Sequence, residues 1–533
     1  MNLQGIYRNM RASGVVLMII LGVAGWLRFQ SLGDKCLWYN EPLSWRLMEF
    51  PVSEIIERSA DRHSIHPPLY FILLHYWSLV FGQSELALRS PAAVSGLWTV
   101  GGAFFFLREL VWLFRPSQAS GRWQNRADLA ALLFALWVAV NPMQIELSRQ
   151  VRHYSLGSAL FLWSNWFLIR ALRLPARPRR YWCGYGALAL ALCYTHYLAL
   201  FSVAAQGLFL VIYFTWLHKD AQPLPSQNSS RQTTASSFRW ACLIGAFLVL
   251  GYLPWVLNMV GSVEGAHRGP WRSGFQMERI PQLTVITALG LDDTYQSLGR
   301  YVEWAICAAL FLAMIGIPLV QKGSGLFLLI CVALPLAAVI SYSLEMNMDK
   351  YLPRYLFLVQ LGLMAAICLL ICSVRSLVQG TLLTFFLAIW VANGLWESWQ
   401  AIGPGASPGM RAAADYILGQ KKTNDLVLAE NPQLLFISSY YLQGRATPLL
   451  YSRGFSRLRV GEAVRLRDDE LIPAELLFRP GITRIWLVQC NFNLSTDDYS
   501  VVFPSGWSKV STKDFLRDRW EDPIAVSLYL FRP

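Results

Sequence analysis

The sequence predicts a polytopic α-helical membrane protein with a small α/β domain at its C-terminal end. Three observations favour this fold class. First, 55% of the 533 residues are hydrophobic and only 15% are charged, whereas a typical soluble protein carries about 25% charged residues. Second, apolar runs of about 20 residues, the length of a membrane-spanning helix, recur as far as residue 398. Third, short helix-like and strand-like segments alternate beyond that residue.

The apolar runs predict about eleven membrane-spanning helices. The first run continues into Trp26 and Arg28 without a small-residue cleavage site, so we expect a retained helix and not a cleaved signal peptide. The expected spans are 14–31, 88–113, 129–147, 155–170, 181–198, 199–217, 240–258, 301–320, 325–343, 353–372 and 380–398.

The placement of basic residues predicts the orientation, because loops rich in Lys and Arg stay in the cytoplasm. The N-terminus and every second loop after it hold the basic clusters, and only Asp128 and Asp220 oppose them. We therefore expect a cytoplasmic N-terminus, an extracytoplasmic tail and no nucleic-acid partner, despite the net charge of +13. The basic residues are Arg8, Arg11, Arg115, Arg122, Arg126, Arg173, Arg177, Arg179, Arg180, Lys219, Arg231, Arg239, Lys322 and Arg375.

One apolar segment, HPPLYFILLHYWSLVFG at 66–82, is too short to fit this scheme. Counting it as a span would reverse every later loop and remove the charge bias. We therefore expect a helix that lies in the membrane interface, anchored by Tyr70, Trp77 and Phe81. The first outer loop is then long, about 32–87, and belongs to a transmembrane domain of residues 1–398.

The tail, residues 399–533, begins with the flexible stretch GPGASPG. A helix-like segment at 410–420 follows, and then the strand-like DLVLAE, the helix-like LLFISSYYLQG, and the strand-like RIWLVQ and AVSLYLF. Such alternation favours a small α/β domain on the outer face. The tail contains no phosphate-loop or dinucleotide fingerprint, so it is assigned no chemistry.

Unusual polar residues gather in the outer loops of this topology, in the segments 41–66, 148–154, 194–197, 266–274 and 349–357. Polar groups at membrane depth are costly and usually face a cavity or a partner. Arg and His outnumber carboxylates in these segments, and the guanidinium fork suits phosphate. A cationic, aromatic-rimmed cavity at the outer surface therefore suits a lipid phosphate, and the lone carboxylate of Glu41 could accept a proton from an incoming hydroxyl.

Each of these residues also has a structural explanation. An Arg near a helix end can extend to the lipid headgroups, an isolated His can be a hydrogen-bonded packing residue, and Glu41 can pair with Arg46. The interpretation as a site therefore rests on the joint pattern. A transporter is disfavoured because the charged groups gather at one face, whereas transporter sites lie near the bilayer midplane.

The same segments resemble a large bacterial family, the integral-membrane glycosyltransferases of the GT-C fold, which are related to protein O-mannosyltransferases and lipid A aminoarabinose transferases. The resemblance covers most of the chain, and its motifs occur in the family's order. The motifs are LWYNEPLSW, HPPLYFILLHYWSLVFGQSELALRSPAAVSG, ELSRQVRHYSLGSAL, CYTHYLALFSVAAQ, PRYLFLVQLGL and MRAAADYILGQKKTNDLVLAE.

The resemblance implies an inverting transfer of a sugar from a polyprenyl-phosphate carrier to a lipid, glycan or protein acceptor, at the outer face of a bacterial inner membrane. An acceptor hydroxyl would attack the anomeric carbon, and the lipid phosphate would leave. No cofactor is indicated with certainty, and a divalent metal is left open. The candidate catalytic residues are Glu41 and Asn40, and the candidate substrate-binding residues are His66, Gln150, Arg152, His153, Tyr154, His196, Arg268, Arg272, Arg354 and Tyr355.

Two positions depart from the family pattern. Asn40 stands where the family usually has the Asp that acts as general base, and Gln150 stands where the family commonly has a Glu. An amide can hydrogen-bond a sugar hydroxyl, but it does not accept a proton near neutral pH. Two alternatives follow: Glu41 has become the base, or the protein is a relative that binds lipid-linked sugar without turnover.

Overall fold

The computed structural model describes residues 3–532, with the exception of 38–39, 61–65, 116–120, 175–177, 220–229, 267–275, 291–298, 346–352, 375, 387–390, 393, 397–408, 453–465, 491–500 and 516–523. The chain divides into two compact units. The helical unit comprises Met1–Gln30, Ser90–Val256 and Arg272–Gly403, and the mixed unit comprises Ser31–Arg89, Leu257–Trp271 and Pro404–Pro533. This division differs from the expected one, because the first loop groups with the tail.

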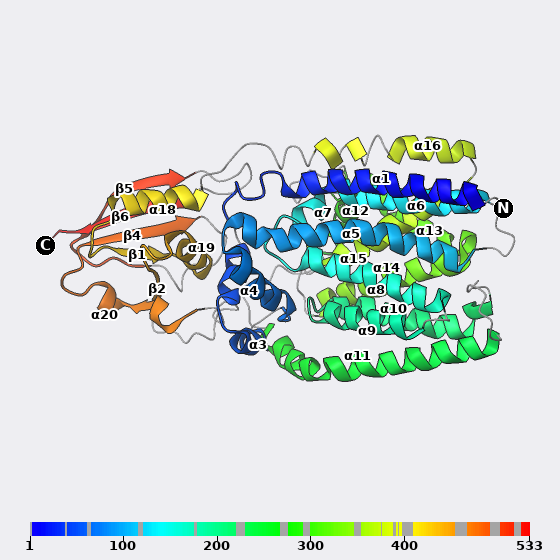
Figure 1. Ribbon diagram of the computed structural model, residues 1–533. Helices are drawn as coiled ribbons and strands as arrows, with labels where there is room; N and C mark the ends of the chain where they lie inside the picture. The colour runs from blue at the N-terminus through cyan, green and yellow to red at the C-terminus, as the bar shows by residue number, and fades with distance from the viewer. Residues whose placement is uncertain are drawn as a thin grey trace. The chain divides into compact units, whose positions relative to one another are not determined.

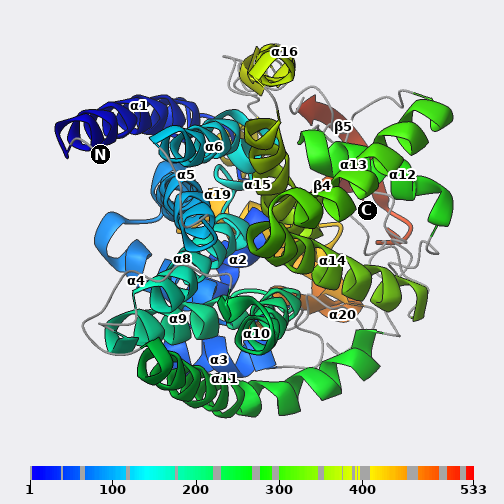
Figure 2. The same cartoon turned by 90° about the vertical axis from the view of Figure 1, so that its right-hand side faces the viewer.

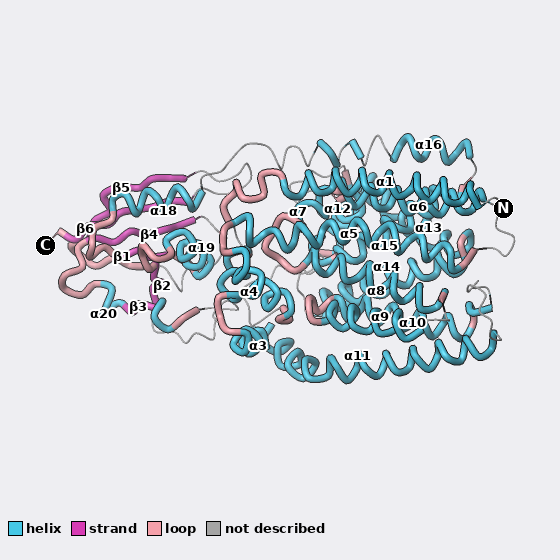
Figure 3. The backbone as a smooth tube through the Cα atoms, viewed as in Figure 1, coloured by secondary structure: helices cyan, strands magenta, loops and turns pink. Residues whose placement is uncertain are grey.

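Long apolar helices build the helical unit (Figures 1 and 3). Three short 3-10 helices connect them: η1 (Leu217–Lys219), η2 (Met277–Arg279) and η3 (Pro353–Tyr355). The α-helices are α1 (Leu3–Phe29), α5 (Glu85–Leu113), α6 (Gly121–Val140), α7 (Pro142–Leu147), α8 (Tyr154–Arg173), α9 (Pro178–Cys193), α10 (Ala199–Thr215), α11 (Ser230–Ala266), α12 (Ile280–Leu289), α13 (Arg300–Val320), α14 (Lys322–Glu345), α15 (Phe357–Ser373) and α16 (Ser376–Phe386).

Five of the described helices are long and apolar enough to cross a membrane, and each overlaps an expected span. These five segments are Ala12–Phe29, Glu85–Leu113, Thr234–Leu257, Arg300–Val320 and Lys322–Glu345. Shorter or less apolar helices occupy the other expected ranges within the described residues. The structure therefore confirms a mainly helical membrane protein, whereas the count of about eleven spans stays a prediction.

The helices of this unit lie side by side, as the view along their axes shows (Figure 2). Helix α6 packs between α1 and α15, and α14 packs against α10, α13 and α15. Alanines such as Ala130, Ala131 and Ala135 are fully buried on α6, and small side chains of this kind let helix backbones approach closely. By contrast, Leu250 on α11 and Leu312 on α13 are each 67% exposed, as expected of helix faces that meet lipid.

The expected span 129–147 is wrong in one respect, because the helix breaks inside it. Helix α6 ends at Val140, and the six-residue α7 begins at Pro142. Between them Asn141 is extended, and its side-chain oxygen accepts a hydrogen bond from the backbone N–H of Gln144 (3.1 Å). Pro lacks an N–H and is favoured in the first turn of a helix. The Asn-Pro pair therefore ends one helix, starts another and redirects the chain toward residues 148–154.

A six-stranded sheet lies in the mixed unit, in the order β3-β2-β1-β4-β6-β5. The first four strands of this order are mutually parallel, and β6 is antiparallel to both β4 and β5. In the register, Val427 of β1 lies between Pro448 of β2 and Trp486 of β4. The strands are β1 (Leu426–Ala429), β2 (Pro448–Ser452), β3 (Leu471–Pro473), β4 (Arg484–Cys490), β5 (Trp507–Phe515) and β6 (Ile524–Phe531).

Hydrophobic side chains cover both faces of this sheet. Helices α18 (Gly409–Gln420) and α19 (Pro432–Leu442) cover one face with a core that includes Ile417, Leu434 and Phe436. The other face buries Leu428 and Ile485 near the short helix α20 (Ala474–Leu477). The strands expected at DLVLAE, RIWLVQ and AVSLYLF are β1, β4 and β6, and the two expected helices are α18 and α19.

The first loop forms three helices, α2 (Glu41–Met48), α3 (Val52–Ala60) and α4 (Leu69–Phe81), and packs onto the tail. Leu43 belongs to the same core as α18 and α19. The Trp45 ring meets the Tyr440 ring edge-on at a centroid distance of 5.2 Å, and the backbone N–H of Leu37 donates to the Tyr441 hydroxyl (2.8 Å). Loop and tail therefore share one hydrophobic core.

Helix α4 corresponds to the short apolar segment 66–82. Its 13 residues are fewer than the roughly 20 that a membrane-spanning helix needs. Tyr70, Phe71 and Leu74 are buried, whereas Leu79 and Val80 are 70% and 74% exposed. A helix that is apolar on its exposed side suits a membrane interface, and the interfacial location of α4 stays a prediction.

Candidate functional site

Three segments that are far apart in sequence bring polar and aromatic side chains together at one end of the helical unit. Arg152 and His153 directly precede α8, His196 lies in the turn between α9 and α10, and Arg354 lies in η3 just before α15. Their position is set locally: α8, α10 and α15 all begin here, while α9 ends here. Helix starts carry unsatisfied N–H groups and positive potential, which favours an anionic ligand.

The rings of this cluster are in contact. The His153 and His196 ring centroids are 5.0 Å apart. The His196 ring lies 6.0 Å from the Tyr154 ring, 6.0 Å from the Tyr355 ring and 5.8 Å from the Phe357 ring. His196 is therefore central, with two ring neighbours from each of the other two segments.

Two guanidinium groups flank these rings. The Arg152 Cζ atom lies 5.8 Å from the centre of the Tyr154 ring, and the Arg354 Cζ atom lies 5.5 Å from the centre of the Tyr355 ring. Contacts of this kind fix an Arg over an aromatic face by cation–π attraction. Arg152 is buried and Arg354 is half-buried. The pair can present guanidinium forks to a phosphate group.

Both histidines are buried, and burial disfavours the imidazolium form. Loss of solvation, and then the charges of His196 and Arg152, hold the pKa of His153 well below its usual value. Burial, assisted by Arg152, lowers the pKa of His196 to about 3. Nδ1 of His196 accepts a hydrogen bond from the backbone N–H of Leu198 (3.1 Å), as a neutral ring can. At neutral pH the positive charge of the cluster is therefore carried by the arginines.

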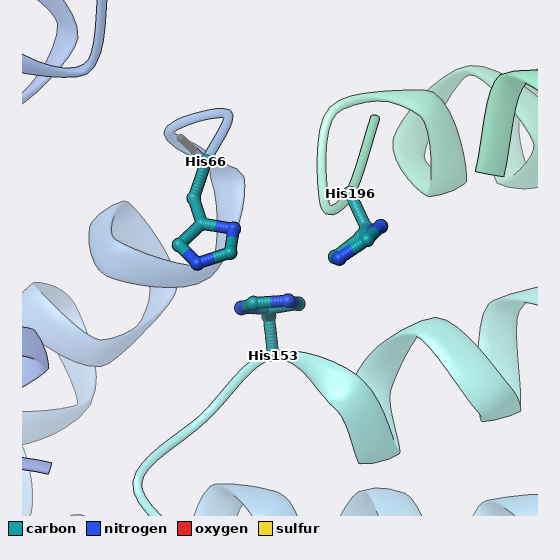
Figure 4. A group of neighbouring side chains, drawn as sticks. All are labelled: His66, His153 and His196. Atoms are coloured by element: carbon teal, nitrogen blue, oxygen red, sulfur yellow. The ribbon is translucent and has the colours of Figure 1, made fainter. Parts of the chain in front are cut away.

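Figure 4 draws the His153 and His196 rings facing each other across the space between their segments. It also draws His66, which belongs to the mixed unit. Neutral imidazoles are ligands that divalent transition metals prefer. A divalent metal, which the sequence left open, would find imidazole donors at this end of the helical unit.

Glu41, the candidate base, lies in the mixed unit as the first residue of α2. Both of its carboxylate oxygens accept hydrogen bonds from Arg89, from Nε at 2.8 Å and from Nη2 at 2.7 Å. Both side chains are buried. Arg89 also donates to the carbonyl oxygens of Leu32 (3.0 Å), Lys35 (2.8 Å) and Cys36 (2.8 Å). The pair therefore ties the start of α2 to the chain that enters the first loop.

The expected partner of Glu41, Arg46, instead makes other ion pairs. Arg46 contacts Glu49 at 2.9 Å and also pairs with Glu470 of the tail. Arg46 is itself buried, so it needs the two carboxylates to offset the loss of water.

The two amides singled out in the sequence, Asn40 and Gln150, are both half-buried. Asn40 precedes α2, and its side chain makes no capping hydrogen bond to that helix. Gln150 donates from Nε2 to the exposed carboxylate of Glu146 (2.9 Å). Neither amide is fully buried, and their roles as sugar contacts stay predictions.

Three predicted site residues remain. Arg268 and Arg272 lie outside the described residues. His66 is buried within the mixed unit.

Sequence reasoning missed Arg89 and Phe357. Arg89 stands in the motif ALRSP at the start of an apolar run. A lone buried carboxylate needs a buried cation, and this rule could have paired Arg89 with Glu41. No sequence signal distinguishes Phe357 from the other apolar residues of its helix.

The overall fold, a bundle of apolar helices with a mixed sheet in the second unit, can be compared with that of solved membrane proteins. The chain is similar over 97% of its length to ArnT, the lipid A aminoarabinose transferase of Cupriavidus metallidurans, in the apo state and bound to undecaprenyl phosphate. In both comparisons the TM-score is 0.57, the sequence identity is 16%, and 98% of the ArnT chain is covered. The expected mainly helical fold, similar to that of ArnT, is thereby confirmed, whereas the number of spans and the outer-face location of the tail stay predictions.

A second similarity is partial. The Saccharomyces cerevisiae protein O-mannosyltransferase complex Pmt1-Pmt2 bound to the sugar donor matches 48% of this chain and 33% of its own, with 17% identity and a TM-score of 0.34. No protein-family model and no curated protein matches the sequence.

Proposed function

We propose that this protein transfers a sugar from a polyprenyl-phosphate carrier to an acceptor at the outer face of a bacterial inner membrane. The cluster of Arg152 and Arg354 around His196 carries the proposal, because two arginines and several aromatic rings converge at one end of a membrane-type helix bundle. The fold is that of ArnT, which has been observed with undecaprenyl phosphate.

The arginines would hold the phosphate of the donor. As the bond between the anomeric carbon and the phosphate oxygen breaks, negative charge grows on the leaving phosphate. Fixed guanidinium groups in a water-poor site stabilise that charge more in the transition state than in the ground state. The neutral imidazoles of His153 and His196 would add hydrogen bonds without adding charge.

The base that accepts the proton of the acceptor hydroxyl is proposed to be Glu41, with Asn40 and Gln150 as amide contacts to the sugar. A carboxylate has about four lone-pair positions, so it can accept a bidentate arginine and still accept another hydrogen bond. The contacts of Arg89 occupy one position on each oxygen. The proposal places the acceptor hydroxyl at this carboxylate, beside Arg89.

A second candidate function is binding of lipid-linked sugar without turnover. The observation that favours it is the buried ion pair itself: Glu41 already has a structural partner in Arg89. In this case the cluster of Arg152, His196 and Arg354 would still bind the lipid phosphate, but no group would accept the proton of an acceptor hydroxyl.

Binding of undecaprenyl phosphate to the purified protein tests the part that both candidates share. Arg152→Gln and Arg354→Gln should each weaken binding by about tenfold or more, since each removes a charge-assisted hydrogen bond. Arg180→Gln is the matched control, because Arg180 is exposed at the start of α9. Unchanged affinity in both site variants would refute the phosphate site.

Turnover separates the two candidates. Cells with and without the protein should differ in their outer-surface glycans and lipid-linked sugars, as measured by mass spectrometry. A protein that binds undecaprenyl phosphate but leaves both sugar pools unchanged would be the non-catalytic relative.

A further inference from the structure

Arg28 joins the end of α1 to the end of α6. It is fully buried in the last turn of α1, and it donates from Nη1 to the carbonyl of Ala139 (2.9 Å) and from Nη2 to the carbonyl of Val138 (3.0 Å). These carbonyls belong to the last turn of α6, which ends at Val140. The C-terminal end of a helix has unsatisfied carbonyls and negative potential. Arg28 therefore caps α6.

Arg149 makes the reciprocal contact. Its Nη1 donates to the carbonyls of Leu27 (3.1 Å), Arg28 (3.1 Å) and Gln30 (2.8 Å), which lie at the end of α1. The segment after α6 and α7 thus caps α1, while α1 caps α6. The two arginines therefore connect the end of α1, the end of α6 and the segment that follows α7.

Two serines fasten this segment further. The Nε of Arg28 donates to the Ser148 hydroxyl (3.3 Å), and the Ser155 hydroxyl donates to the carbonyl of Ala92 on α5 (2.8 Å). The segment 148–155 is therefore held on both sides of the three residues that enter the phosphate cluster.

A glycine of α5 makes room for these contacts. A Cβ atom at Gly96 would lie 2.4 Å from the Ser148 hydroxyl oxygen and 2.6 Å from Nε of Arg28. These distances are too short for any side chain. The close approach of Arg28 and Ser148 to α5 thus requires glycine at this position.

We propose that Arg28 and Arg149 are positioning residues for the phosphate site. They hold the backbone of residues 148–155 so that Arg152, His153 and Tyr154 reach the cluster. Arg149 acts on carbonyls at the end of α1, and its effect on a ligand passes through the backbone that it shares with Arg152. The inference rests on the proposed function, because it needs Arg152 to bind a phosphate.

A double-mutant cycle on the full-length protein tests this assignment. The affinity for undecaprenyl phosphate is measured for the wild type, Arg149→Gln, Arg152→Gln and the double variant. Arg152→Gln should weaken binding about tenfold or more, and Arg149→Gln should weaken it several-fold. The double variant should bind only slightly more weakly than Arg152→Gln alone, since the guanidinium that Arg149 positions is then already gone and only His153 and Tyr154 remain to be positioned.

Two further variants separate positioning from charge and from folding. Arg149→Lys should restore part of the affinity, because an ammonium can donate to the same carbonyls but lacks the planar fork. Gly96→Ala keeps every charge and displaces Arg28 and Ser148, so it should also weaken binding several-fold. If Arg149→Gln does not fold, the affinity of Gly96→Ala tests the positioning role instead.

The outcomes are distinct. If Arg149→Gln weakens binding equally with and without Arg152, Arg149 contacts the lipid itself and the positioning role is refuted. If folded Arg149→Gln and Gly96→Ala bind normally, the role is also refuted while the phosphate site stands. If Arg152→Gln binds undecaprenyl phosphate normally, the proposed phosphate site is refuted, and the positioning role that depends on it is refuted as well.

Discussion

Replacing Glu41 with glutamine should destabilise the mixed unit measurably. The carboxylate accepts two hydrogen bonds from Arg89, and the two side chains are 8% and 6% exposed. Breaking a buried ion pair from one side typically costs about 3–5 kcal/mol, because a charge is left without its partner. Arg89 keeps its three carbonyl acceptors, so we expect the lower end of that range.

A loss of about 3 kcal/mol corresponds to a melting temperature that is lower by roughly 6–12 °C for a unit of 150–250 residues. The assay is a thermal melt of the purified protein followed by intrinsic fluorescence. Glu54→Gln is the matched control, since its pair with Arg58 is 36% and 22% exposed, and such exposed pairs contribute less than about 1 kcal/mol.

Turnover is measured separately, well below the melting temperature of each variant. If Glu41 is also the base, Glu41→Gln should lower the rate by about 10²–10⁴-fold in protein that is still folded. A melting temperature equal to that of the wild type would refute the reasoning about the buried pair. Unchanged turnover in the folded variant would remove Glu41 as the base.

Three further outcomes are expected. Protease added to intact spheroplasts should remove residues 399–533; protection until lysis would overturn the orientation. Gly157→Ala places a Cβ atom 3.1 Å from the ring of Phe357, so a thermal melt should show a loss of about 1–3 kcal/mol, whereas Gly207→Ala, in a helix interior with open space around it, should not destabilise the protein. If Glu41 is the base, Asn40→Asp should not raise turnover in a kinetic assay. A large gain in turnover would mean that the natural site lacks a base.

The sequence predicts the parts of the fold that depend on local patterns. Apolar runs of bilayer length locate the helices, and alternating elements locate β1, β4 and β6. The break at Asn141 was missed because the apolar run continues across it, although the Asn-Pro pair is a helix-start signal in its own right.

The sequence predicts which residues gather around His196 better than it predicts the partner of Glu41. Arg152, His196 and Arg354 come from three motifs, and the structure brings their neighbours into contact. The sequence offers Arg46, five residues away, as a structural partner of Glu41, whereas the structure pairs Glu41 with Arg89. Ion pairs between segments depend on how the chain folds back on itself, which sequence proximity does not encode.

The shared core of the first loop and the tail has a consequence for biogenesis. Residues 31–89 leave the ribosome early, yet Leu43 and Trp45 pack against partners that lie beyond residue 404. Contacts of such long sequence separation form slowly and leave apolar surface exposed in the meantime. The early loop must therefore wait for its partners until almost the whole chain has been made. A chain that stops before the tail would leave this core unfinished and its apolar side chains exposed.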